Sequence, residues 1–340
     1  MTIQEAIAKL IDAQNLTRDE MTGVMNQIMS GEATDAQIGA FLIALRIKGE
    51  SVDEIVGAAS VMREKATPIK TKHSVLVDTC GTGGDHSGTF NISTTAAFVV
   101  AGAGLCVAKH GNRAATSQSG SADVLKALGV HVEASPEVIS RCLDEVGIGF
   151  LFAVSLHGAM KYAIGPRREV GARTVFNALG PLTNPAGAKR QVIGVYSAAL
   201  TETLAKVLGN LGSEHVFVVH GSDGLDEMTL TGPTRVSELK NGSVSTYDVS
   251  PSDFGLTQAS ASDLQGGPAD ENAKMTLAIL NGETGPKRDI VLLNAAAAIV
   301  AGGKAKDLAE GIQVAAKVID SGRALEKLEG LKKVSQGVAL

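Results

Sequence analysis

Glycine-rich and hydroxyl-rich stretches of this chain could bind an anion. The stretch VDTCGTGGD, residues 77–85, follows an apolar segment and places three glycines within residues 81–84. Where side chains are absent, consecutive backbone N–H groups can converge on an anion. The spacing fits neither the Walker loop, which ends in GK[ST], nor the dinucleotide-binding fingerprint. We interpret Gly81–Asp85 as an anion-binding turn, and a purely structural tight turn is the alternative.

Two further stretches place hydrogen-bond donors at the start of predicted helices. TFNIST, residues 89–94, leads into an apolar helix, and a helix N-terminus with spare donors can bind phosphate. Simple helix capping is the alternative. KHGNR, residues 109–113, follows an apolar strand and precedes a serine-rich segment, so Lys109 could act as a point charge on phosphate. Here the alternative is a solvated basic loop, and His110 is interpreted as an orienting or structural histidine.

A pair of acidic residues, Asp226 and Glu227, follows the apolar segment 216–220. Adjacent carboxylates on a loop suit Mg²⁺, a hard cation that takes oxygen ligands from protein, water and substrate phosphates. A solvated acidic pair is the alternative. The sequence shows no Ser/His/Asp triad, and the flanks of Cys80 give no sign of an activated thiol. The motifs together predict group transfer on a small phosphorylated ligand, by positioning and charge neutralisation.

The elements that must position these motifs follow a strand–helix alternation from residue 75 onward. Such alternation predicts a sheet covered by helices on both faces, with ligands bound on the loops at the carboxyl ends of the strands. We expect strands at 75–78, 104–108, 129–132, 148–152, 191–195 and 215–220. We expect helices at 93–103, 119–128, 136–145, 199–212 and 292–302, and a helical end over 305–331.

The first 66 residues show helical spacing of apolar residues instead, with capping signals at Thr17, Thr34 and Ser51. We therefore predict an α/β protein with a small all-helical N-terminal domain and a larger α/β domain. The central sheet of the larger domain is expected to be mixed, mostly parallel and flanked by helices. The predicted domains are residues 1–70 and 71–340, and a helical insertion at about 160–190 is expected to pack on the first.

Composition limits the partners of this chain. Its 340 residues include 31 basic and 36 acidic side chains, for a net charge of −5 without a basic tract. Nucleic acid and membrane are therefore not expected as partners. The three cysteines have no metal or disulfide spacing, which favours reduced thiols in a cytoplasmic protein. The longest apolar run, residues 96–108, is too short and glycine-interrupted to span a bilayer.

The motifs, taken in order along the chain, resemble the anthranilate phosphoribosyltransferase family. The resemblance is carried by DTCGTGGD, TFNIST, KHGNR, RTVFNALGPLTNPA (173–186), HGSDGLDE (220–227) and NGETGPKRDIVLLNAAAAIVAGG (281–303). It implies transfer of phosphoribosyl from phosphoribosyl pyrophosphate to anthranilate, with pyrophosphate released. That reaction gives N-(5-phosphoribosyl)anthranilate, the second step of tryptophan biosynthesis from chorismate. The resemblance also implies Mg²⁺ and a homodimer assembled through the helical domain.

The resemblance implies a role for individual residues as well. The implied catalytic residues are Lys109, Asp226, Glu227 and Arg167, and the implied metal ligands are Ser93, Asp226 and Glu227. The implied contacts with phosphoribosyl pyrophosphate are Gly81, Gly84, Asp85, Thr89, Asn91, Ile92, Ser93, Thr94, Lys109, His110, Gly111, Asn112, Arg113, Ala114, Ala115, Thr116, Ser117 and Ser121. Anthranilate is expected to contact Gly81, Asn112 and Arg167, with His110, His157 and Gly180 nearby.

The chain departs from the family pattern beside the expected anthranilate site. Leu156-His157-Gly158-Ala159-Met160 stands where the family usually has His-His-Pro-Ala-Met, and Gly165-Pro166 replaces a common Pro-Val.

Two rival functions are open. The first is a pyrimidine nucleoside phosphorylase. That family has its lysine and its glycine loop in one motif, Lys-His-Ser-Thr-Gly-Gly, whereas in this chain the lysine motif and the glycine loop are separate. A non-catalytic nucleic-acid-binding relative would have a basic surface and altered metal residues.

Overall fold

The computed structural model describes residues 1–85, 87–114 and 118–338. The N-terminal part is a bundle of four helices, α1 (Ile3–Ile11), α2 (Arg18–Ser30), α3 (Asp35–Lys48) and α4 (Val52–Lys65). Each begins with a capping box, in which a Ser or Thr side chain accepts from the backbone three residues on and a Glu or Gln returns the bond. The predicted start signals at Thr17, Thr34 and Ser51 are confirmed.

The larger part contains a seven-stranded sheet in the order β3-β2-β1-β4-β5-β6-β7. The strands are β1 (Leu76–Gly81), β2 (Cys106–Gly111), β3 (Ile148–Phe152), β4 (Arg190–Gly194), β5 (His215–Gly221), β6 (Thr234–Lys240) and β7 (Ser243–Val249). The first five run parallel, and β6 and β7 add an antiparallel hairpin at one edge. The expected fold, a small helical domain with a larger α/β domain built on a mixed, mostly parallel sheet, is confirmed.

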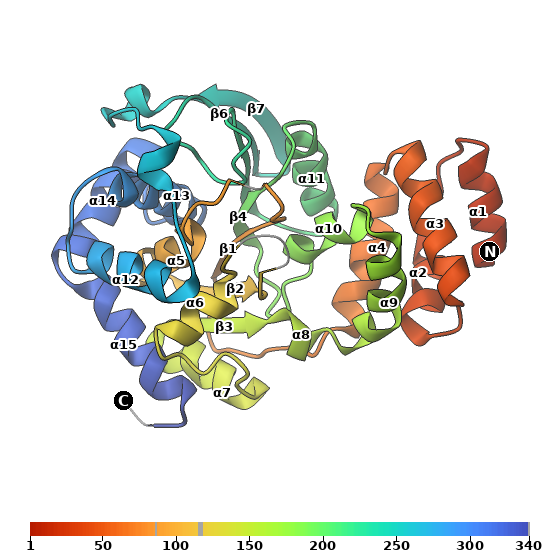
Figure 1. Ribbon diagram of the computed structural model, residues 1–340, viewed down its shortest axis with the longest axis horizontal. Helices are drawn as coiled ribbons and strands as arrows, with labels where there is room; N and C mark the ends of the chain where they lie inside the picture. Colours follow the sequence, from red (N-terminus) through yellow and green to blue (C-terminus); the bar gives the residue numbers. More distant parts are fainter. Residues whose placement is uncertain (86, 115–117, 339–340) are drawn as a thin grey trace.

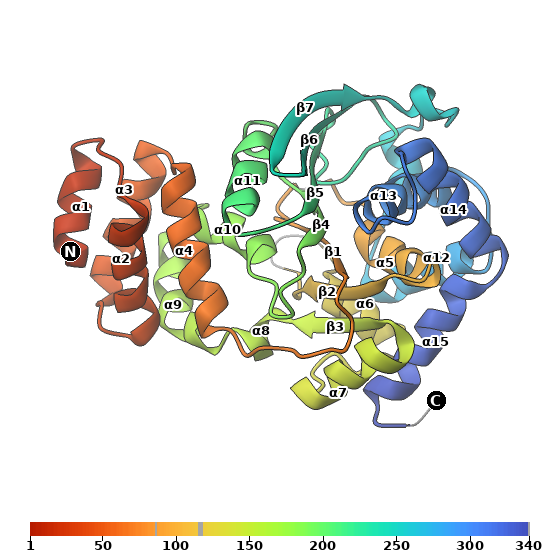
Figure 2. The ribbon, with the colours of Figure 1, turned by 180° about the vertical axis from the view of Figure 1, so that it is seen from behind.

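Helices cover both faces of the sheet (Figure 1, Figure 2). Alternate residues of β4 and β5 point to opposite faces, as strand geometry requires. Val192, Phe217 and Val219 join the core beneath α5 and α13, whereas Ile193 and Val218 join a second core that continues into the helical bundle. The covering helices are α5 (Ile92–Gly102), α6 (Ser121–Ala127), α7 (Pro136–Arg141), α11 (Ala199–Asn210), α12 (Ala269–Leu280), α13 (Pro286–Ala301), α14 (Leu308–Asp320) and α15 (Arg323–Ser335).

Residues 153–182 leave the sheet and return to it by way of the bundle. They form α8 (Ala153–Leu156), α9 (Lys161–Val170) and α10 (Val175–Leu179). Helix α9 packs against α2 and α3, which Figure 1 shows beside the bundle. The chain thus crosses between its two parts three times, before β1, after β3 and before β4.

One expected strand is absent, and two strands of the sheet were not predicted. Residues 129–132 form no strand, because their backbone groups bond elsewhere: Val130 N–H donates to Leu125 of α6, and His131 N–H donates to the Ser335 hydroxyl. The buried Val130 and Val132 simply fill the core. The hairpin of β6 and β7 was not predicted, although it carries a strong signal. Asn241 and Gly242 both have positive φ, as the tight turn of such a hairpin requires.

Candidate functional site

The candidate site lies at the carboxyl ends of the parallel strands. The sheet order reverses direction at β1, which has β2 on one side and β4 on the other. In open α/β sheets, ligands bind in the crevice at such a switch point. The glycine-rich loop follows β1, Lys109 and His110 end β2, and Asp226-Glu227 follow β5. The structure therefore brings together the four motifs that the sequence predicted.

The glycine-rich loop and the acidic pair are in direct contact. The Gly83 N–H donates to Oδ2 of Asp226 at 2.8 Å. A Cβ on Gly81 would lie 2.4 Å from the same oxygen, and one on Gly194 would lie 1.5 Å from the Asp226 carbonyl oxygen. Glycine at both positions lets the acidic loop pack directly on the ends of β1 and β4. Packing against Asp226 thus explains a glycine at position 81, in addition to the contact with substrate that the sequence predicts.

The carboxylates of Asp226 and Glu227 resist ionisation in the absence of a cation. Loss of solvation, with Asp85 and Glu227 nearby, raises the pKa of Asp226 well above its ordinary value. Loss of solvation also raises the pKa of Glu227 to about 7, although Lys109 and Ser93 act in the opposite direction. Such a pair fits a hard divalent cation, whose charge would compensate for the lost water.

Ser93 lies beside this pair at the start of α5. Its N–H donates to Oε1 of Glu227 at 3.1 Å, and its hydroxyl accepts from Lys109 at 3.5 Å. The described residues contain no group of three or more His, Cys, Asp or Glu side chains that could hold a metal. A cation here would therefore need oxygen ligands beyond the two carboxylates.

Lys109 is a buried cation at the end of β2, with 3% of its surface exposed. Its Nζ donates to the Thr79 carbonyl and to Ser93. Burial lowers its pKa, while Asp78 and Glu227 act to raise it. Lys109 thus presents a positive charge from beneath the glycine loop, with acidic groups on two sides.

His110 and His157 form a buried pair whose hydrogen bonds define their tautomers. Nδ1 of His110 lies 3.1 Å from the Gly180 carbonyl, and the two Nε2 atoms lie 3.2 Å apart. A carbonyl only accepts, so Nδ1 of His110 carries the proton and its Nε2 accepts from Nε2 of His157. Burial is the main cause that lowers the pKa of His110 to about 3 and that of His157 to about 4. Both rings are therefore neutral at pH 7, and Nδ1 of His157 is unprotonated.

The remaining residues of the lysine motif hold their own loop together. The Ser121 hydroxyl accepts a hydrogen bond from the Asn112 N–H at 3.2 Å and donates one to the Asn112 carbonyl at 3.1 Å. The Arg113 side chain pairs with Glu133 at 2.7 Å, and the Ala114 N–H donates to Asp123. Gly111 is needed here, because a Cβ would lie 2.2 Å from the Ser121 hydroxyl. The predicted contacts Ala115, Thr116 and Ser117 lie outside the described residues.

At the start of α5, the side chains of the predicted contacts Asn91, Ile92 and Thr94 are already bonded or buried. The Asn91 amide is engaged with Ser119 and Asn272, and its side chain makes no helix-cap bond in the described structure. Ile92 and Thr94 are buried, so their side chains face the core. Thr89 pairs with Gln265 through an isolated antiparallel bridge.

Arg167 lies on α9, with its guanidinium 5.0 Å from the centre of the Phe176 ring. Loss of solvation lowers its pKa, and no carboxylate of the described residues lies within ion-pair distance. Its charge is thus available to an anion. Of the departures from the family pattern, Leu156 is a core residue, whereas Gly158 and Gly165 have open space where a Cβ would stand.

Reasoning from the sequence missed a buried network beneath the lysine motif. Asp78, with no exposed surface, accepts from the His110 N–H and from the Asn184 amide, at 3.0 and 2.8 Å. Asn184 also donates to the Ala108 carbonyl, so it ties the returning segment to β1 and β2. Loss of solvation, together with the nearby Asp78, raises the pKa of the Cys80 thiol well above its ordinary value, in accord with an inert cysteine. Asp78, a charged residue in the predicted strand 75–78, was the available signal.

Family models match both parts of the chain. Residues 73–325 match the glycosyl transferase family a/b domain, and residues 4–66 match the helical bundle domain of the same family. No helix among the described residues is long and apolar enough to cross a membrane.

Curated relatives are similar over nearly the whole length. The anthranilate phosphoribosyltransferase of Moorella thermoacetica is 57% identical over 329 residues, which cover 97% of each chain. The protein of the same name from an Anaeromyxobacter species is 58% identical with the same coverage.

Solved structures share the fold as well. The anthranilate phosphoribosyltransferase of Thermus thermophilus has a TM-score of 0.92 at 44% identity, over 97% of this chain and 99% of that one. A Saccharomyces cerevisiae structure of the same name, in complex with PRPP and Mg, has a TM-score of 0.90 at 29% identity, over 99% and 98%.

Proposed function

The chain belongs to the anthranilate phosphoribosyltransferase family, and on this premise we propose that it transfers phosphoribosyl from phosphoribosyl pyrophosphate to anthranilate. The products would be N-(5-phosphoribosyl)anthranilate and pyrophosphate, in the second step of tryptophan biosynthesis. The observation that carries the proposal is the convergence of the glycine loop, Lys109 and Asp226-Glu227 at one edge of the sheet. Such a site offers backbone donors, a cation and metal-binding carboxylates to one diphosphate.

Charge stabilisation is the main task of these residues in the reaction. When pyrophosphate leaves the ribose carbon, negative charge grows on the leaving group and positive charge on the sugar. The Lys109 ammonium and the backbone N–H groups of Gly84 and Asp85 would stabilise the leaving oxygens, most strongly where water is excluded. The N–H groups of Thr82 and Gly83 are already bonded within the protein. Ser93, Asp226 and Glu227 would hold Mg²⁺, which when bound neutralises diphosphate charge.

Arg167 would bind the carboxylate of anthranilate. Its planar guanidinium can form two parallel hydrogen bonds to that group, and the described residues leave it without an acidic partner. The amine of anthranilate is neutral at pH 7, so its attack needs no strong base. The neutral His110–His157 pair would shape the acceptor side together with Gly180.

The protein is also proposed to form a homodimer through its helical domain. Ile11 and Ile47 on the bundle are 72% and 82% exposed, the two most exposed large apolar side chains of the described residues. An apolar partner surface would remove them from water. A second copy of this chain is the proposed partner.

One assay tests the proposed reaction. The protein is mixed with Mg²⁺, phosphoribosyl pyrophosphate and anthranilate, and the loss of anthranilate fluorescence is followed with and without a chelator. We expect a decrease that needs both phosphoribosyl pyrophosphate and the cation. Persistent fluorescence with a folded protein would refute the proposal. Phosphorolysis of thymidine by the same preparation would instead favour the nucleoside phosphorylase.

A further inference from the structure

Arg173 reaches the glycine-rich loop from the segment that returns from the helical bundle. It lies between α9 and α10, and its Nη2 donates to the Gly84 carbonyl. The same guanidinium stacks on the Tyr196 ring, 4.3 Å from its centre. A cation stacked on an aromatic face is held in a defined plane. Arg173 is thus oriented by Tyr196 toward a single carbonyl of the loop.

The peptide that Arg173 holds is one that could otherwise turn over. Gly84 has φ of 77°, and glycine passes readily between positive and negative φ. In a trans peptide, the C=O and the following N–H point in opposite directions. Holding the Gly84 carbonyl therefore also sets the direction of the Asp85 N–H. If this peptide flipped, it would present a carbonyl oxygen where an anion needs a donor.

The rest of the loop is held by the sheet side of the molecule. Thr82 N–H donates to the Gly194 carbonyl, the Thr82 hydroxyl accepts from Tyr196 N–H, and Gly83 N–H donates to Asp226. Among the described residues, Arg173 is the one hydrogen-bond partner of Gly84. The orientation of the Gly84–Asp85 peptide thus depends on its contact with Arg173, which comes from the segment returning from the helical bundle.

That contact links the two substrate sides. Arg173 lies three residues beyond the end of α9, the helix that carries Arg167 and packs on the bundle. Resting on the proposed function, we propose that Arg173 is a positioning residue for phosphoribosyl pyrophosphate, which fixes the Gly84–Asp85 peptide from the acceptor side. Displacement of α9 away from the sheet would release this peptide.

Arg173→Met tests the proposal, because methionine keeps an apolar stem for the Tyr196 ring and removes the donor. We expect the KM for phosphoribosyl pyrophosphate to rise at least about tenfold, as loss of a charged hydrogen bond allows. The KM for anthranilate should change less than about threefold. In the ligand-free protein, amide hydrogen exchange of residues 82–85 should become faster. Arg173→Lys, which keeps a donor, should recover part of both losses.

Two comparisons make the result decisive. Arg168→Met changes an exposed arginine of α9 and should match the wild type in both readouts. Tyr196→Leu removes the ring that orients Arg173 but keeps the backbone N–H. It should raise the KM for phosphoribosyl pyrophosphate, and it provides the test if Arg173→Met does not fold. An unchanged KM for phosphoribosyl pyrophosphate, or unchanged exchange of the ligand-free loop, would overturn the positioning role. An inactive wild type would instead refute the proposed reaction, while the exchange measurement still tests the loop.

Discussion

At the scale of single residues, the site concentrates ionisable groups where water is scarce. Asp78 in β1 and Lys109 in β2 are both buried, and the carboxyl groups of Asp226 and Glu227 have raised pKa values. Burial of charge costs stability unless partners or a bound ion compensate. Perturbed groups of this kind gather at functional sites. The cost is explained if a cation and a diphosphate complete the arrangement.

Asp226→Asn tests the acidic pair. The amide oxygen can still accept from the Gly83 N–H, so the loop should keep its shape. Loss of one metal-binding charge should lower kcat by roughly a hundredfold, the scale of other preorganised electrostatic contacts. Turnover at limiting Mg²⁺ and thermal unfolding measure the two effects. Asp248→Asn, on the exposed β7, is the control, and equal turnover of all three proteins would exclude the proposed metal role.

His157→Gln tests the buried histidine pair by the pH dependence of stability. The pKa of His157 is lowered from 6.5 to about 4, so between these values the unfolded chain binds a proton that the folded chain does not. The free energy of unfolding therefore falls as the pH drops through this window. Glutamine can still donate to Nε2 of His110.

As the pH falls from about 6 to about 4.5, the free energy of unfolding of the wild type should decrease by about 1.4 kcal/mol per pH unit more than that of His157→Gln. Urea unfolding at several pH values gives the two slopes. Equal slopes would mean that the folded protein takes up the proton at His157.

At the scale of elements, the packing of one loop on two strand ends sets the geometry of the site. Gly194→Ala would put a methyl group 1.5 Å from the Asp226 carbonyl oxygen, so the backbone must move. We expect a loss of about 1–3 kcal/mol of stability and more than about tenfold lower kcat. Gly23→Ala is the control, because nothing lies within 4 Å of its Cβ and it stands inside α2. It should gain about 0.5–1 kcal/mol.

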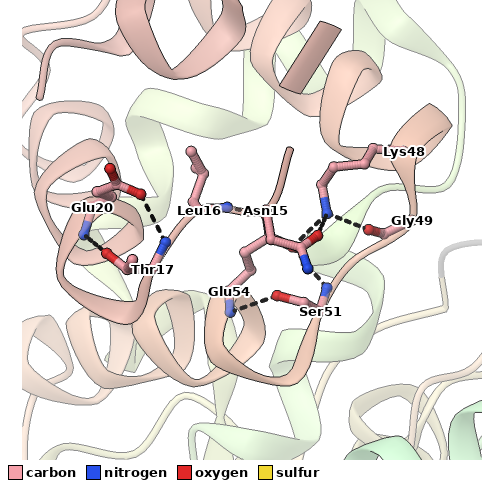
Figure 3. Close-up of polar contacts among 8 residues, drawn as sticks. All are labelled: Asn15, Leu16, Thr17, Glu20, Lys48, Gly49, Ser51 and Glu54. Atoms are coloured by element: carbon pink, nitrogen blue, oxygen red, sulfur yellow. Dashed lines mark hydrogen bonds and ion pairs between the residues drawn. The ribbon is translucent and has the colours of Figure 1, made fainter. Parts of the chain in front are cut away.

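Figure 3 shows two of the four capping boxes of the helical bundle, those at the start of α2 and α4, which differ in burial. Glu20 of α2 caps its own helix and pairs with the partly exposed Lys9. Glu54 of α4 has no exposed surface, and besides Ser51 N–H it accepts from Leu16 N–H and from Lys48 at 2.9 Å. Glu54 thus ties the loop before α2 to the loop before α4.

Lys48→Met should therefore cost far more than Lys9→Met. The first leaves the buried Glu54 carboxylate without its cation, a loss of about 3–5 kcal/mol. The second breaks a partly exposed pair worth about 1 kcal/mol or less. Denaturant unfolding of both variants measures the difference. Similar small losses would show that Glu54 is satisfied by its backbone donors alone.

At the scale of the whole molecule, the bundle stands to one side of the sheet, with its outer helices α1 and α3 away from the site (Figure 2). Ile47→Asp should disrupt the proposed homodimer by placing a charge in an apolar contact. Sedimentation velocity should show a dimer for the wild type and a monomer for the variant. Val338→Asp, at an exposed position near the C-terminus, should leave the dimer unchanged. A monomeric wild type would refute the dimer.

Local signals were sufficient for much of the architecture. Hydrophobic periodicity and capping residues predicted that the first 66 residues are helical, and β-branched runs predicted five of the seven strands. The strand predicted at 129–132 was wrong because its two valines are buried in the core without pairing in the sheet. The division at residue 70 stays a prediction, although the helical and sheet parts are evident.

The sequence by itself determined which chemistry was available. The glycine loop, Lys109 and Asp226-Glu227 are local motifs, and parallel strands bring their carboxyl ends to one edge of a sheet. Only the tertiary structure decided which groups meet. Gly194 under Asp226, Asn184 on Asp78 and Arg173 on Gly84 join residues that lie 32, 106 and 89 positions apart. Such contacts depend on how the crossing segments pack, and spacing along a chain does not encode that distance in space.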